Sequence, residues 1–187
     1  MPHFTVSPTR VLILDDHPAI RYALNETISA QRDLDVMAKA ASADEAFEAV
    51  TKERPDVAVV DIALGDAHGL DLVQRLHAVY PDVKVVVFSM YDETIYAERA
   101  LRAGASGYLM KSESPDQVVE AIRAVVNGEI YLSRRMSSKL LSRVASGRKS
   151  SEPSFAIDDL TDREMAVFQM MGQGHNLDEI SHQLNLS

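Results

Sequence analysis

Four apolar segments of strand length end in residues that carry a charge or a hydroxyl group. The segments are VLILDD (11–16), VAVVD (57–61), VVVFS (85–89) and GYLMK (107–111). Short runs that are apolar at nearly every position are typical of parallel strands covered by helices on both faces. The carboxyl ends of such strands share one edge of the sheet, where open α/β sheets bind ligands. We therefore expect Asp15, Asp16, Asp61, Ser89 and Lys111 to converge on one small volume.

Helical patterns alternate with these strands along the chain. A second strand is expected at 34–41, and apolar residues at helical spacing come after each strand, with capping patterns at Ser42 and Ser114. The weakest helical pattern, near 92–103, offers Ile95, Ala100 and Leu101 as inward residues. Five strands and five helices in alternation predict a doubly wound α/β domain.

Composition narrows the class of protein. The chain has 187 residues, enough for one full domain and a small second one, and 46% of them are hydrophobic. It contains no cysteine, which excludes disulfides and thiolate metal sites. The longest apolar runs are of strand length, and the N-terminus lacks the pattern of a secretory signal. We expect a cytoplasmic protein with no membrane partner.

Charge is distributed unevenly. Residues 1–132 carry 12 Lys and Arg against 21 Asp and Glu, whereas residues 133–159 carry 6 against 3. The acidic first part is not expected to bind nucleic acid through its general field. We interpret the basic stretch as a solvated helix face and linker, with phosphate contact as the alternative.

The pattern changes after Leu132. A short helical pattern leads into SGRKSSEPS (146–154), which has the composition of a linker. Structure resumes with a helix whose inward residues are predicted to be Val167, Phe168 and Met171, and Asn176 can cap a second short helix. Two helices joined by a glycine-bearing turn predict a helix-turn-helix.

The strand-end residues have a shared chemistry. Three neighbouring carboxylates repel one another unless a hard cation joins them, and a few oxygen ligands favour Mg²⁺ or Mn²⁺. An Asp can accept a phosphoryl group, and a metal ion, a lysine and a hydroxyl can stabilise its oxygens. Each residue alone is more often a turn former or helix cap, so the signal lies in their joint occurrence. His17, beside the acidic pair, is interpreted as a helix-start residue whose ring lies outside the site.

Several sequence motifs make two regions of the chain resemble known protein families. They are DDHPAIR (15–21), VVDIALGDAHGLDL (59–72), VVVFSM (85–90) and ALRAGASGYLMKS (100–112). Through them, residues 10–128 resemble the receiver domain of bacterial two-component response regulators of the NarL/FixJ type. Residues 160–187 resemble the first two helices of a LuxR-type DNA-binding domain.

The resemblance implies a fold and a set of residue roles. The fold is a flavodoxin-like five-stranded parallel sheet of order 2-1-3-4-5, followed by a linker and a partial all-α helix-turn-helix. The implied roles are Asp61 as phosphoryl acceptor, Asp15, Asp16, Asp61 and the Ala63 carbonyl as metal ligands, Ser89 and Tyr108 as switch residues, and Lys111 as phosphoryl contact. From the residues alone, the preferred interpretation of Tyr108 is a strand residue half-buried at the sheet edge. The sequence departs from the family pattern at Gly65, Met90 and Ser112.

The resemblance also implies a function. A sensor histidine kinase would phosphorylate the receiver at residues 1–132, and inward movement of Ser89 and Tyr108 would favour a homodimer. Residues 133–159 would form a helical segment and linker, and residues 160–187 would belong to a domain that binds promoter DNA. No enzymatic activity is expected beyond Mg²⁺-dependent self-phosphorylation and slow self-dephosphorylation. The alternative is a receiver-like interaction module that acts without phosphorylation, which Gly65 and Met90 would favour.

The last residues of the sequence lead to an expectation about DNA binding. A helix-turn-helix reads bases through its second helix, and Ser187 would be the N-cap of that helix. The base-contacting residues would lie beyond it, so we expect a truncated chain, a proteolytic product or part of a longer regulator. Such a chain is not expected to bind promoter DNA specifically.

Overall fold

The structure is a computed structural model that describes residues 7–64, 69–145, 162–172 and 176–183. The chain divides into two compact units, Met1–Ser133 and Arg134–Ser187. We describe each unit separately. Within the described residues, no helix combines the length and apolar character needed to cross a membrane.

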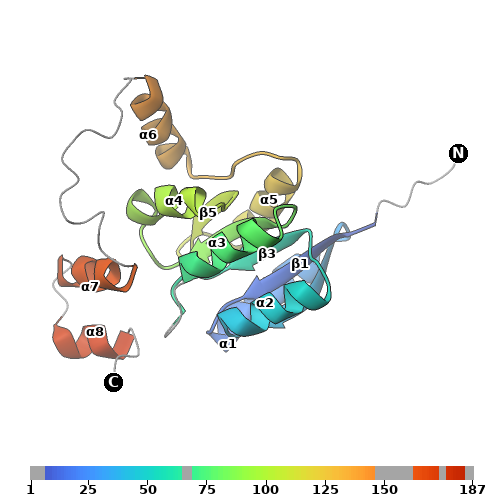
Figure 1. The fold of residues 1–187 in the computed structure, drawn as a ribbon, viewed down its shortest axis with the longest axis horizontal. Coiled ribbons are helices and arrows are strands. Elements are labelled where there is room, and N and C mark those ends of the chain that lie inside the picture. Colours follow the sequence, from blue (N-terminus) through green and yellow to red (C-terminus); the bar gives the residue numbers. More distant parts are fainter. Residues whose placement is uncertain (1–6, 65–68, 146–161, 173–175, 184–187) are drawn as a thin grey trace, which may run out of the picture. The chain divides into compact units, whose positions relative to one another are not determined.

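The first unit is built on a parallel sheet (Figure 1). Its strands are β1 (Thr9–Leu14), β2 (Leu34–Ala40), β3 (Val57–Val60), β4 (Lys84–Ser89) and β5 (Gly107–Met110). The strand order is β2-β1-β3-β4-β5, and every neighbouring pair is parallel. The predicted fold and strand order are therefore confirmed. The order reverses beside β1, between β1 and β3, which is where such sheets form ligand sites.

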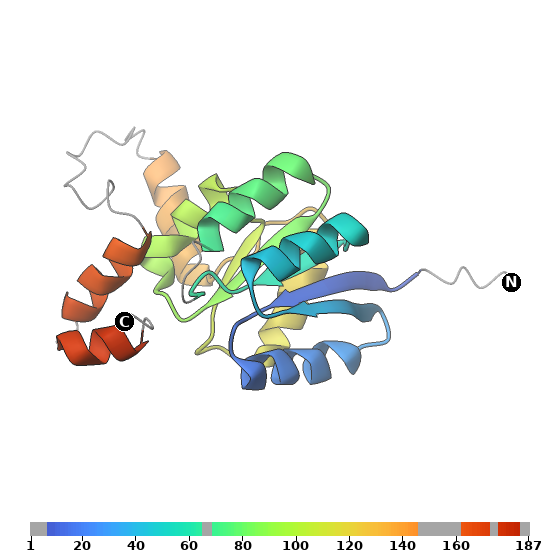
Figure 2. The same cartoon turned by 60° about the horizontal axis from the view of Figure 1, so that its bottom comes forward.

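Helices cover both faces of this sheet. They are α1 (Pro18–Ser29), α2 (Ala43–Lys52), α3 (Gly69–Val79), α4 (Glu93–Arg102) and α5 (Pro115–Val126). Helices α1 and α5 contact each other on one face, and α2, α3 and α4 follow one another across the opposite face (Figure 2). Because both faces are covered, strand residues of either parity are buried.

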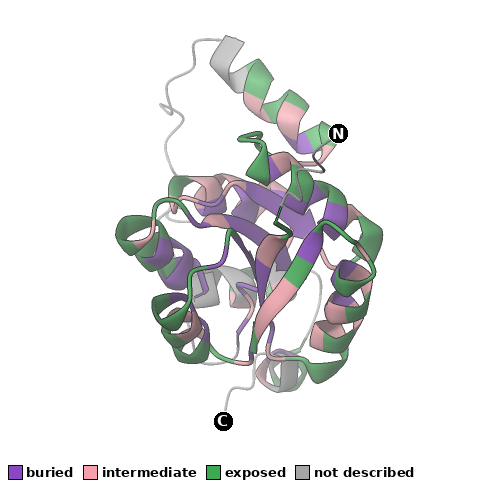
Figure 3. Ribbon diagram, turned by 90° about the vertical axis from the view of Figure 1, so that its right-hand side faces the viewer, coloured by how far each residue is buried: buried purple, intermediate pink, exposed green. Residues whose placement is uncertain are grey.

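Burial is concentrated in the strands (Figure 3). Val11, Leu12, Ile13 and Leu14 of β1 are at most 1% exposed, although successive side chains point to opposite faces. The layer between the sheet and helices α1 and α5 contains a core cluster of apolar side chains. It comprises Val11, Ile13, Leu24, Ile28, Leu34, Val57, Val59, Val86, Phe88, Leu109, Val118, Val119, Ala121, Ile122 and Val125.

The predicted inward residues of helix α4 are confirmed only at Ala100. Its buried apolar residues are Tyr96, Ala97 and Ala100, whereas Ile95 and Leu101 are only half-buried. Tyr96 stacks on the ring of Tyr91 at a centroid distance of 4.6 Å. The buried face of α4 therefore consists of an aromatic ring and two alanines.

The chain after α5 returns along the outer edge of β5. The Tyr108 N–H donates to the Tyr131 carbonyl at 2.9 Å, and the Tyr131 N–H donates to the Ser106 carbonyl at 3.0 Å. Further along, the Ser133 hydroxyl donates to Glu93 Oε1 of α4 at 2.7 Å. This segment therefore joins the edge strand to the first turn of α4.

The second unit contains α6 (Arg134–Ala145), α7 (Asp162–Gly172) and α8 (Leu177–Gln183). The predicted cap of α8 is confirmed, because Asn176 Oδ1 accepts from the Glu179 N–H at 2.9 Å and Glu179 Oε2 accepts from the Asn176 N–H at 3.0 Å. The predicted inward stripe of α7 is wrong at Phe168 and Met171, which are 53% and 57% exposed. The linker at 146–154 and Ser187 lie outside the described residues.

Candidate functional site: a buried lysine among three carboxylates

Each predicted site residue follows or ends a parallel strand of the first unit. Asp15 and Asp16 follow β1, Asp61 follows β3, Ser89 ends β4 and Lys111 follows β5. Strands β1 and β3 are direct neighbours, and the Asp61 N–H donates to the Leu14 carbonyl at 2.8 Å. The sheet thus places Asp61 beside the β1 carboxylates.

Lys111 bridges two of the carboxylates. Its Nζ lies 2.5 Å from Asp61 Oδ2 and 2.6 Å from Asp15 Oδ2. The Lys111 side chain is 6% exposed and both carboxylates are 1% exposed, so the three charges interact almost without water. The third carboxylate, Asp16, is 27% exposed. Three carboxylates and one ammonium together carry a net charge of −2, which one divalent cation would balance.

Burial and the ion pair have opposite effects on the pKa values of Asp61 and Lys111. Burial raises the pKa of Asp61 above its ordinary value, and the nearby Lys111 offsets only part of that rise. Burial alone would lower the pKa of Lys111, but the Asp61 and Asp15 carboxylates outweigh it and raise that pKa. The lysine therefore keeps its proton at neutral pH and acts as the internal counter-cation.

Ser89 contributes a buried polar atom to the same edge. Its side chain is fully buried, and among the described residues its Oγ has no hydrogen-bond partner. A buried hydroxyl without a partner costs free energy, so such groups commonly await a ligand. The Ala63 N–H donates to Asp61 Oδ1 at 2.9 Å, which fixes the Asp61 carboxylate from the side opposite Lys111.

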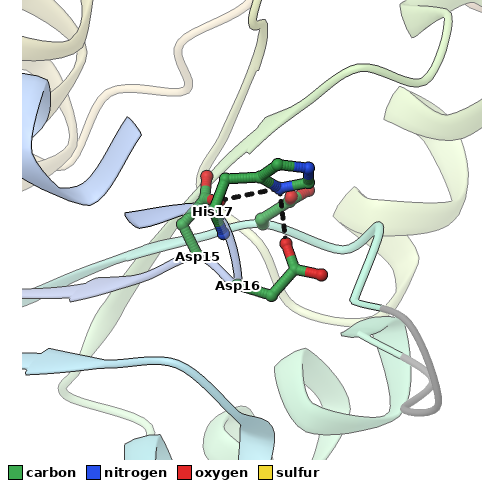
Figure 4. Close-up of side chains that lie close together, drawn as sticks. Asp15, Asp16 and His17 are labelled. Carbon is green, nitrogen blue, oxygen red and sulfur yellow. Dashed lines mark hydrogen bonds and ion pairs between the residues drawn. The ribbon is translucent and has the colours of Figure 1, made fainter. Parts of the chain in front are cut away.

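His17 lies against the acidic pair (Figure 4). Its Nδ1 is 2.6 Å from Asp16 Oδ1 and 3.4 Å from Asp15 Oδ1, while the side chain remains 59% exposed. The prediction that this ring lies outside the site is therefore wrong. The His17 N–H donates to Asp15 Oδ1 at 2.9 Å as well, so both the backbone and the ring of His17 face the acidic pair.

A possible metal site results from this arrangement. One ligand atom from each of Asp15, Asp16, His17 and Asp61 can be chosen so that all lie within 4.8 Å of one another. Arg21 was not anticipated from sequence, and its Nη1 donates to the Asp15 carbonyl at 2.5 Å. Its position four residues after His17, on the first turn of α1, was the available signal.

Tyr108 is enclosed in the first unit. Its side chain is 1% exposed, its hydroxyl donates to the Tyr91 carbonyl at 2.8 Å, and burial raises its pKa well above the ordinary value. Ser89 and Tyr108, the predicted switch residues, are both buried. Met90 is 69% exposed, and Gly65 lies outside the described residues.

Comparisons with known proteins agree with this architecture. Residues 11–123 match the response regulator receiver domain family. The chain is 30% identical over 190 residues to the transcriptional regulatory protein DegU of Brevibacillus brevis, an alignment that covers 95% of this chain and 80% of DegU. It is 28% identical over 182 residues to the oxygen regulatory protein NreC of Staphylococcus epidermidis, covering 95% and 84%. A LuxR-family response regulator from Aurantimonas sp. SI85-9A1 superposes with a TM-score of 0.68 at 29% identity, covering 74% of this chain and 99% of that structure.

The family match spans more than half of the chain, and so the protein belongs to the response regulators and carries their receiver domain. Among the named relatives, DegU is a transcriptional regulatory protein and the Aurantimonas protein is a two-component response regulator of the LuxR family. They give no support to the alternative of an interaction module that acts without phosphorylation.

Proposed function

We propose that this response regulator is switched by transfer of a phosphoryl group from a sensor histidine kinase to Asp61. The observation that carries the proposal is the Asp61 carboxylate itself, which is 1% exposed yet held between the Lys111 ammonium and the Ala63 N–H. Its oxygen attacks phosphorus while the bond between phosphorus and the kinase imidazole breaks. The departing imidazole nitrogen keeps the bonding electron pair and takes up a proton from solvent.

The neighbouring groups match the charge that the reaction brings. A phosphoryl group on Asp61 adds about −1.5 to −2 charges and three acceptor oxygens. Lys111, already 2.5 Å from Asp61, is the proposed cationic contact for one oxygen. The unpartnered hydroxyl of Ser89 is the proposed donor to another. Such pre-placed donors stabilise developing charge without reorganisation.

The donor set fits a divalent metal. Asp15, Asp16 and Asp61 supply carboxylate oxygens, and the Ala63 carbonyl is proposed as a further ligand. The net charge of the site supports this fit, because its three carboxylates outnumber the single buried ammonium by two. Mg²⁺ or Mn²⁺ bound there would neutralise the phosphoryl oxygens, and with it the protein is expected to phosphorylate itself from a small donor and dephosphorylate slowly.

The proposed output is transcriptional. Ser89 and Tyr108 form the switch, and Tyr108 is connected through its hydroxyl to Tyr91 and through its N–H to Tyr131. Phosphorylation would alter this region and favour a homodimer. We assign residues 1–132 to the receiver, 133–159 to a helical segment and linker, and 160–187 to part of a LuxR-type domain for promoter DNA. The protein is proposed to act in the cytoplasm, without a membrane partner.

The test is phosphorylation by a small phosphodonor in the presence of Mg²⁺. Intact-mass spectra should show one phosphoryl adduct on the native protein and none on Asp61→Asn. Asp82→Asn, which changes an exposed aspartate at the end of the first unit opposite the site's strand ends, is the matched control and should retain the adduct. An unchanged adduct on Asp61→Asn would place the acceptor elsewhere and refute the proposal.

A further inference from the structure

The His17 imidazole has no part in the proposed phosphoryl transfer. His17 is the N-cap residue of α1, with φ −84° and ψ 113°, and its side chain makes no capping hydrogen bond. Pro18 begins the helix, and the His17 carbonyl accepts from the Arg21 N–H at 3.1 Å. The backbone of His17 is therefore fixed by the helix start, while the imidazole is directed to the carboxylates.

The ring stands at the spacing of a metal ligand. Two ligand atoms bound at right angles to one ion, with bonds of about 2.1 Å, lie about 3 Å apart. The distances from His17 Nδ1 to Asp16 Oδ1 and Asp15 Oδ1, 2.6 Å and 3.4 Å, fall on either side of that value. The buried, unpartnered Ser89 hydroxyl at the same sheet edge is a separate sign that this edge receives a ligand.

The His17 imidazole and the Lys111 ammonium contact different carboxylate oxygens of Asp15. Lys111 Nζ pairs with Oδ2, whereas His17 Nδ1 and the His17 N–H both face Oδ1. An ion on the His17 side can therefore engage Asp15 without first displacing the ammonium. Coordination needs Nδ1 without a proton, and the neutral ring then carries its proton on Nε2.

We propose that His17 Nδ1 is a ligand of the metal ion and makes the site prefer first-row transition metals to Mg²⁺. This inference rests on the metal site of the proposed function. Three carboxylates alone form an oxygen site suited to Mg²⁺, whereas an imidazole nitrogen binds transition metals far better than it binds Mg²⁺. His17 thereby decides which divalent ion the receiver holds.

The experiment uses Mn²⁺ as a paramagnetic probe in the full chain. Pulsed electron paramagnetic resonance of the Mn²⁺ form should show hyperfine coupling to a directly bound nitrogen. His17→Gln should lose this coupling, and His77→Gln, at an exposed position of α3, should keep it. In competition, the Mg²⁺ concentration that displaces half of the Mn²⁺ should fall about tenfold in His17→Gln, the lower end of the loss typical for residues that support a metal site.

Three results would overturn the inference. Absence of nitrogen coupling in the native protein, with Mn²⁺ binding that is lost in Asp61→Asn, removes His17 as a ligand and leaves the proposed function standing. Binding of Mn²⁺ that is unaffected by Asp61→Asn places the ion elsewhere, and then the metal site of the proposed function fails together with the inference. An unchanged competition curve in His17→Gln likewise excludes a role in selectivity.

Discussion

The candidate site has an inner and an outer half, which differ in the groups that balance the negative charge of their carboxylates. The inner half, made of Asp15, Asp61, Lys111 and Ser89, is at most 6% exposed, and its carboxylates already pair with an ammonium. The outer half, made of Asp16 and His17, is 27% and 59% exposed and pairs only through the imidazole. Charges interact strongly where water is excluded and weakly where it is not. The inner half should therefore govern stability, and the outer half should govern which ion enters.

The largest expected effect follows from removing the inner cation. Lys111→Met leaves the buried Asp15 and Asp61 carboxylates without their partner, and breaking a buried ion pair in this way costs about 3–5 kcal/mol. We expect a loss of that order in metal-free buffer, measured by urea unfolding. Added Mg²⁺ should restore most of it, because a divalent ion replaces the missing charge.

The control for this change is Lys39→Met, at an exposed position of β2. It should lose little stability and show no dependence on Mg²⁺. A Lys111→Met protein as stable as the native chain without metal would contradict the division into two halves.

A smaller effect is expected at alkaline pH from Tyr108. Its pKa in the folded protein lies well above 10.0, whereas an unfolded chain ionises its tyrosines near pH 10. Above about pH 10 the unfolded state alone releases this proton, so stability falls by up to about 1.4 kcal/mol per pH unit through this one group. Tyr108→Phe should cost about 1 kcal/mol at pH 7 through the lost hydrogen bond to Tyr91, and this deficit should shrink as the pH rises beyond 10.

Thermal unfolding between pH 7 and 11 measures this change. Tyr22→Phe, at a site that is 68% exposed, should show the same pH dependence as the native protein. A deficit of Tyr108→Phe that stays constant with pH would mean that burial does not keep the phenol neutral.

Replacing Ser89 should affect the proposed switch while leaving the stability of the fold nearly unchanged. Because its Oγ is buried without a partner among the described residues, Ser89→Ala should change stability by less than about 1 kcal/mol, in either direction. In the native protein, beryllofluoride with Mg²⁺ is expected to change amide exchange around α4 and β5, and the same variant should lose this change. A native-like response would assign the phosphoryl contact to another residue.

The smallest effect on stability is expected in the outer half. Asp16→Asn removes a partly exposed carboxylate, and pairs of this kind contribute about 0–1 kcal/mol. The loss should appear instead in metal affinity, measured by calorimetry with Mg²⁺ and Mn²⁺. A stability loss as large as that of Lys111→Met would show that the two halves act as one.

The sequence was sufficient for the sheet because the same signal occurs in four of its five strands, β2 being the exception. Uninterrupted apolar runs and polar strand ends are set by the parallel topology, and so the region in which Asp15, Asp61 and Lys111 meet could be anticipated. The direction of the His17 ring could not, since it depends on a side-chain rotamer that no spacing in the sequence encodes. In α4, the apolar pattern identified the buried Ala100 but not the buried Tyr96, whose ring stacks on Tyr91.

The segment around Tyr131 affects how the sheet meets other chains. An edge strand normally presents unpaired backbone groups that another strand can use as a template. Here Tyr131 takes up the Tyr108 N–H and the Ser106 carbonyl, and the Glu113 N–H donates to the Met110 carbonyl at 3.0 Å. The part of the β5 edge beside Tyr131 is thus occupied by its own chain, which hinders strand-to-strand aggregation there. A second molecule that associates at these positions has to do so through side chains and not by extending the sheet.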